Sequence, residues 1–182
     1  MPGELNVEEY RDGSSSLAGF PGEIATVAMP SLALIFHPYH VKEFDMSCEG
    51  MEEWQGRPVW KVRFEQRMDK PATMSVLQVG GMQYAILLKG KAWIDVENFQ
   101  IVHLETDLMR PIPEVKLSKE HQTLDYGPVQ FQQKGQRLWL PLEAEIYVDA
   151  GGKQFHHRHA FSEYRIFSVD AQDKVGNPKT GR

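Results

Sequence analysis

The histidines near the end of the chain come closest, by spacing, to a site that could do chemistry. In a strand, His157 and His159 would point to one side, and His156 would point to the other side with Arg158. Two imidazoles on one face could ligate zinc or copper, but such a site needs one or two further ligands. The sequence places no further ligand beside them, and the Arg158 cation would repel a metal ion. We therefore predict no metal site, and a metal-assisted enzyme stays only as the third alternative.

Two pairs of carboxylates could divide the acid and base roles of an enzyme. Glu105 and Asp107 share a predicted strand face with His103, and Glu143 shares another face with Glu145. Such a pair works when burial separates the two pKa values, but the solvated face of a half-buried sheet explains both pairs more simply. Serine-nucleophile and glycine-rich phosphate-binding motifs are absent from the sequence. We therefore predict no catalytic residue, no cofactor and no enzymatic activity.

Short strands are the elements that would position these side chains. Apolar and polar residues alternate over 60–65, 102–108 and 138–148, with turn signals such as Gly80-Gly81 and Gly151-Gly152 between the runs. This period of two is typical of antiparallel strands with one buried face. A further strand is predicted where the apolar side chains of Tyr84, Ile86 and Leu88 would share one face. We predict an α+β fold that is mainly antiparallel β. It would be a strongly curved sheet or incomplete barrel of about eight or nine strands, with one or two helices on the concave side.

Three segments are expected along the chain: a flexible acidic arm over 1–22, a single domain over 23–168 and a flexible tail over 169–182. Within the domain a helix is predicted over 23–38, starting near Met29 because Pro30 suits a first turn. Residues 111–121, with two prolines, are expected to form a loop with at most one helical turn. Cys48 is expected to be a small buried side chain.

Composition excludes several classes of protein. The 182 residues are 41% hydrophobic and carry a formal net charge of -5, so a basic nucleic-acid-binding module is not expected. The longest apolar stretch, 24–36, has 13 residues, whereas a membrane-spanning helix needs about 20. The acidic residues before it do not suit a secretory signal peptide, which predicts a cytoplasmic protein if Met1 is the true start.

Three segments resemble one known family. They are KGKAWIDVENFQIVHLETDL from Lys89, LWLPLEAEIYVDAGGK from Leu138, and FSEYRIFSV from Phe161. Together they make about residues 56 to 169 similar to the LolA/LolB-like periplasmic lipoprotein carriers and outer-membrane lipoprotein-sorting proteins. The resemblance implies a location in the periplasm or cell envelope, and a hollow sheet that receives acyl chains without catalysis.

The resemblance thus implies a binding domain for a lipid, an acyl chain or another hydrophobic ligand, without a cofactor. A protein-interaction or sensor module on the same fold, docking an envelope protein without lipid cargo, is the alternative. The residues expected to line the hollow are Trp60, Val62, Phe64, Tyr84, Ile86, Leu88, Val102, Leu104, Leu140 and Ile146.

Overall fold

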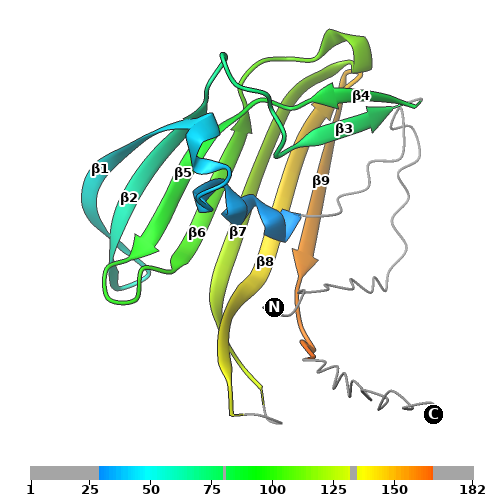
Figure 1. Cartoon of the computed structure of the whole chain (residues 1–182). Helices are drawn as coiled ribbons and strands as arrows, with labels where there is room; N and C mark the ends of the chain where they lie inside the picture. Colours follow the sequence, from blue (N-terminus) through cyan, green and yellow to red (C-terminus); the bar gives the residue numbers. More distant parts are fainter. Residues whose placement is uncertain (1–28, 80, 132–134, 166–182) are drawn as a thin grey trace, which may run out of the picture.

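An open antiparallel sheet forms the body of the computed structural model, which describes residues 29–79, 81–131 and 135–165 (Figure 1). The main sheet has seven strands in the order β1-β2-β5-β6-β7-β8-β9, and β3 pairs with β4 in a separate two-stranded sheet. The main strands are β1 (Phe44–Trp54), β2 (Arg57–Gln66), β5 (Leu88–Asp95), β6 (Ile101–Leu108), β7 (Leu117–Gln130), β8 (Arg137–Ala150) and β9 (Lys153–Ala160). The short pair is β3 (Val76–Val79) and β4 (Met82–Ala85). The predicted fold class is therefore confirmed.

The helices within the described residues are all short 3₁₀ segments: η1 (Met29–Phe36), η2 (Val41–Glu43) and η3 (Pro113–Val115). Figure 1 shows η1 crossing one face of the main sheet. The helix predicted over 23–38 is thus present over 29–36, but as a 3₁₀ helix, and the part before Met29 lies outside the described residues. No helix within the described ranges is long and apolar enough to cross a membrane.

The face of the sheet that carries η1, called the inner face below, holds the main hydrophobic core. Leu32 and Ile35 of η1 are buried there against Phe64, Leu88 and other strand residues. The rings of Phe36 and Phe44 meet Phe64 edge-on, with centroids 5.8 and 5.9 Å away. Burial of this kind is the main stabilising contribution in a sheet with one covered face. The opposite face, called the outer face below, carries most of the charged residues of the strands.

The sequence predicts a single strand that contains Tyr84, Ile86 and Leu88, and this prediction is wrong. Strand β4 ends at Ala85 and β5 begins at Leu88, so the chain leaves one sheet and enters another between them. At this crossing the backbone N–H of Ile86 donates to the carbonyl of Ser75 at 2.9 Å. All three side chains still pack in or against the main core, which is why their apolar spacing resembled one strand.

The strict alternation predicted over 138–148 is interrupted by a β-bulge between β7 and β8. Tyr126 pairs with Pro141, whereas Asp125 pairs with Glu143, so Leu142 has no partner of its own. Because Leu142 is an extra residue, the buried and exposed positions of β8 are exchanged in the part of the strand that precedes it. As a result Pro141 is buried, while Leu138 and Leu142 are exposed.

Two smaller expectations also need correction. The loop predicted over 111–121 contains η3, but β7 already begins at Leu117, because the chain turns at Lys116 with φ of 56° and pairs with β8. Cys48 is exposed rather than buried, since β1 is an edge strand that is bulged immediately after this residue. The predicted arm over 1–22 and tail over 169–182 lie outside the described residues.

Candidate functional site

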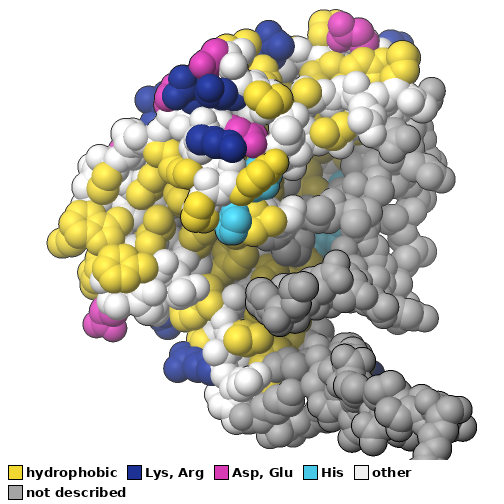
Figure 2. Space-filling model, viewed as in Figure 1, with side chains coloured by type: hydrophobic (Ala, Val, Ile, Leu, Met, Phe, Trp, Pro, Cys, Tyr) yellow, Lys and Arg dark blue, Asp and Glu magenta, His cyan; other side chains and the backbone are white. Residues whose placement is uncertain are grey.

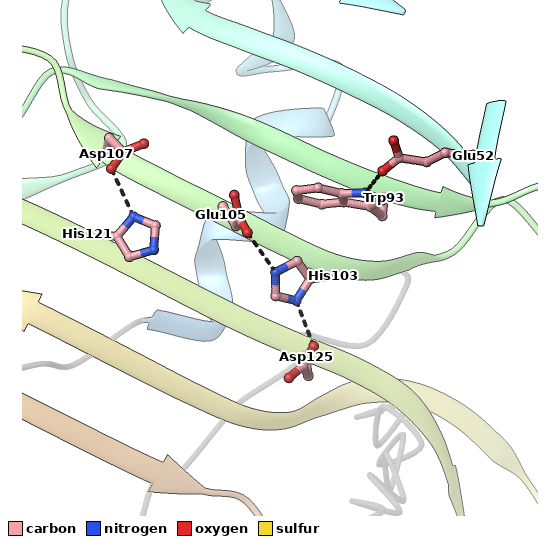
Figure 3. Close-up of polar contacts among 7 residues, drawn as sticks. All are labelled: Glu52, Trp93, His103, Glu105, Asp107, His121 and Asp125. Atoms are coloured by element: carbon pink, nitrogen blue, oxygen red, sulfur yellow. Dashed lines mark hydrogen bonds and ion pairs between the residues drawn. The ribbon is translucent and has the colours of Figure 1, made fainter. Parts of the chain in front are cut away.

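A network of histidines, carboxylates and tryptophans lies on the outer face of the sheet, and Figure 3 shows its polar contacts, with Trp93 as the tryptophan drawn. At its centre is His103 of β6, a buried side chain. Its Nδ1 lies 2.7 Å from Oδ1 of Asp125 on β7, and its Nε2 lies 3.3 Å from Oε1 of Glu105. The Trp54 ring stacks on the imidazole with centroids 4.2 Å apart. The alternation in the sequence predicted the shared face of His103 and Glu105, but not these partners.

Strands β1, β2 and β5 extend the network. The indole N–H of Trp93 donates to Glu52, and Nζ of Lys61 lies 3.1 Å from the other oxygen of the same carboxylate. These donors, Trp93 first and then Lys61, lower the pKa of Glu52. Trp93 itself packs against the buried Val59 and Val102, so the network is anchored in a second, smaller core.

The contacts of His103 define what this network can do chemically. A general base needs one ring nitrogen free to reach a substrate proton. Both nitrogens of His103 already face carboxylate oxygens, and one ring face is covered by Trp54. The arrangement therefore suits a cross-strand support that ties β6 to β7 and to the end of β1.

The other histidines on the outer face also have cross-strand carboxylate partners. Nδ1 of His121 lies 2.9 Å from Oδ1 of Asp107, as Figure 3 shows. His156 stacks on Tyr147 at 4.3 Å, and its Nε2 lies 3.3 Å from Glu145. Within the described residues, no three His, Cys, Asp or Glu side chains lie together as metal ligands would.

An apolar row crosses the inner face at one end of the sheet, beyond the part packed against η1. Met51 of β1 pairs with Trp60 of β2, and Trp60 pairs with Ile94 of β5, which in turn pairs with Ile101 of β6. Met51 is 63% exposed and Trp60 is 37% exposed. Figure 2 shows hydrophobic side chains exposed over β1 and β2 at this end.

The structure places the predicted hollow-lining residues in several different environments. Those on the inner face near η1 are buried in the main core, and Tyr84 packs against it. Trp60 and Val62 lie further toward the open end of β2, with Trp60 exposed and Val62 half-buried. Leu140 pairs with Gly127 before the β8 bulge, so Pro141, rather than Leu140, continues the face of Ile146. The buried members are Phe64, Ile86, Leu88, Leu104 and Ile146, while Val102 is buried in the second core.

The inner face also carries polar groups that the sequence analysis did not single out. Thr106 is 1% exposed, and its hydroxyl has no hydrogen-bond partner within the described part of the chain. It pairs with Gln122, whose side-chain amide donates to Glu120 two residues away. Burial raises the pKa of the Glu120 carboxyl, and the hydrogen bond from Gln122 opposes this only in part.

A hollow of about 330 Å³ opens where β1 and the end of β2 meet. Its lining is mostly polar, unlike that of a typical site for an apolar ligand. The lining residues are Asp45, Met46, Ser47, Arg63, Glu65, Gln66, Arg67 and Met68.

Comparison with protein-family models, with curated proteins and with solved structures finds no match for this chain.

Proposed function

We propose that this protein is a non-catalytic binding domain whose inner face receives an apolar ligand, such as the acyl chain of a lipid. The observation that carries the proposal is the apolar row of Met51, Trp60 and Ile94, which continues the core beyond the area packed against η1. Contiguous exposed apolar surface marks a binding site more often than isolated exposed residues do. The resemblance to lipoprotein carriers suggests the same kind of ligand.

The chemistry of this row suits acyl chains. Side chains of Met, Trp and Ile offer flexible or flat apolar surface without charge, and Met adapts to ligands of variable shape. Burial of a chain contributes about 0.8 kcal/mol per methylene, so a few methylenes laid along the row would give measurable affinity.

The first test is native mass spectrometry of the purified chain, followed by organic extraction and lipid analysis. A bound lipid or fatty acid would support the proposal and identify the ligand class. In parallel, a fluorescent fatty acid is titrated into protein stripped of lipid. Saturable binding of one probe per chain is expected.

Variants on the row connect binding to this surface. Trp60→Glu and Met51→Glu should each weaken probe binding about tenfold or more, because a charge on the row must be desolvated when the probe binds. Met68→Glu is the matched control, since Met68 is also 63% exposed but lies outside the row. Absence of both lipid and probe binding would overturn the proposal and favour the protein-interaction alternative. If Met68→Glu weakens probe binding as much as the substitutions in the row do, the row is not the binding site.

A further inference from the structure

The two edge strands of the main sheet carry opposite charge. Strand β1 (Phe44–Trp54) contains four carboxylates and no Lys or Arg. Strand β9 (Lys153–Ala160) contains Lys153, Arg158 and three histidines, and no Asp or Glu. Within the described residues, no strand pairs with the free edge of β1 or with the free edge of β9. An unpaired edge presents backbone N–H and C=O groups that can extend the sheet with another strand.

The acidic side chains of β1 are accessible to a partner. Asp45, whose side chain is 79% exposed, lies on the outer face opposite Glu65. Glu49 sits at the bulge between Cys48 and Gly50 and is exposed. On β9, Lys153 is exposed, and Arg158 remains 63% exposed although it is ion-paired with Glu143.

The two edges also match in face and in direction. On β9, His156 and Arg158 share the outer face, because they pair with Tyr147 and Glu145. Each neighbouring pair in the seven-stranded sheet is antiparallel, so β1 and β9 run in the same direction. A second copy related mainly by translation would therefore place its β9 beside β1 in parallel, with inner faces on the same side.

We propose that this chain associates with a second copy of itself by pairing β1 of one copy with β9 of the next. With the two strands starting together, Arg158 of the second copy comes beside Glu49, and Gln154 comes beside Asp45 on the outer face, while Lys153 lies on the inner face with Ala150. Such head-to-tail contacts generate a ring if the rotation closes and a filament if it does not. This inference does not rest on the proposed ligand, since it concerns the edges and not the inner face.

The test measures the oligomeric state of the whole chain by sedimentation and light scattering over a range of protein concentrations. Association is expected at about 0.05 M salt and should weaken toward about 0.5 M, because screening shortens the reach of exposed charges. Hydrogen exchange should slow in β1 and β9 as the protein concentration rises, and in no other described strand.

Charge-reversal variants make the test specific. Asp45→Lys/Glu49→Lys on β1, and Gln154→Glu/Arg158→Glu on β9, should each weaken self-association about tenfold or more because like charges then meet at the edge. An equimolar mixture of the two variants should associate again, because each reversed edge then finds its opposite. The control Glu97→Lys/Glu114→Lys makes the same charge change as the β1 variant at two exposed sites outside both edge strands.

Each outcome decides the proposal. The proposal is supported if the mixture associates again and if each variant alone has the same melting temperature as the wild type. A wild-type chain that stays monomeric at low salt overturns it, and an external basic strand would then be the partner that fits β1. Association that survives both reversals also overturns it, because the contact would then use another surface.

Discussion

Glu120 carries a carboxyl group on the inner face of β7, opposite the buried Val148 of β8. Apolar surroundings disfavour the charged form of a carboxyl group, and this burial raises its pKa. The amide of Gln122 donates to the carboxylate but does not remove the effect. The group therefore links the stability of the fold to pH.

The pH dependence follows from comparing the folded and unfolded states. Below the ordinary value of 4.5 the group is protonated in both states. As pH rises above that value, the unfolded chain ionises first, and stability is lost until the pH passes the raised pKa of the folded state. Glu120→Gln, which cannot ionise, should therefore be more stable than the wild type at neutral pH and closer to it at acidic pH.

Urea unfolding at a series of pH values measures this difference. Glu114→Gln is the matched control, because it removes one carboxyl group from an exposed position. A stability difference between Glu120→Gln and the wild type that does not grow with pH would contradict the prediction.

His103 illustrates how neighbours decide the role of a residue. A lone histidine on a charged strand face could be an acid, a base or a metal ligand. Contacts of both ring nitrogens with Asp125 and Glu105, together with the Trp54 stack, make it a support between strands. Both of its ring nitrogens face carboxylate oxygens.

The packing of β5 depends on a glycine. Gly90 lies between Phe64 of β2 and Thr106 of β6 in the pairing register. A Cβ atom at this position would lie 2.0 Å from the carbonyl oxygen of Glu105 and 2.7 Å from Cζ of Phe64. The carbonyl belongs to the backbone of β6 inside the sheet, and Phe64 is fully buried, so neither can move away without loss of packing.

Gly90→Ala should therefore lower the free energy of unfolding by about 1–3 kcal/mol, the usual cost of overpacking a core. Gly127→Ala is the matched control, because its Cβ would meet only Cδ1 and Cγ of Leu142, an exposed and flexible side chain. Chemical denaturation of both variants gives the comparison. An equal or larger loss at Gly127 would show that space at Gly90 is not limiting.

Over the whole molecule, η1 covers only part of the inner face. Ile35 is fully buried, and Leu32 is 4% exposed, whereas Leu34 on the same helix is 46% exposed. The helix has eight residues, too few to be stable in isolation, so its position depends on these anchors. The open sheet and the short helix together leave the row of Met51 and Trp60 exposed.

Truncation of Ile35, the fully buried residue of η1, tests how much the stability of the fold depends on the packing of this helix against the sheet. Ile35→Ala should cost about 2–5 kcal/mol of stability and should increase binding of a dye that detects exposed apolar surface. Leu34→Ala, the exposed neighbour, should change both readings little. Equal effects of the two substitutions, measured by urea unfolding and dye fluorescence, would contradict this account of η1.

The sequence by itself determined the strand content of this protein and most of the inward and outward faces. Period-two alternation reports directly on which side of a strand is buried, because successive side chains point to opposite faces. That is why Phe64, Leu104 and Ile146 were assigned to one buried face, and why His156 and Arg158 were assigned to the opposite face from His157.

Only the tertiary structure decided what depends on contacts between distant segments. The bulge at Leu142 reversed the alternation of β8, and the pairing register brought Asp125 to His103 and Glu52 to Trp93. A bulge or a register shift costs little locally and is selected by the packing of the whole sheet. The same packing left β1 and β9 as the edges of an open sheet, which no local pattern could reveal.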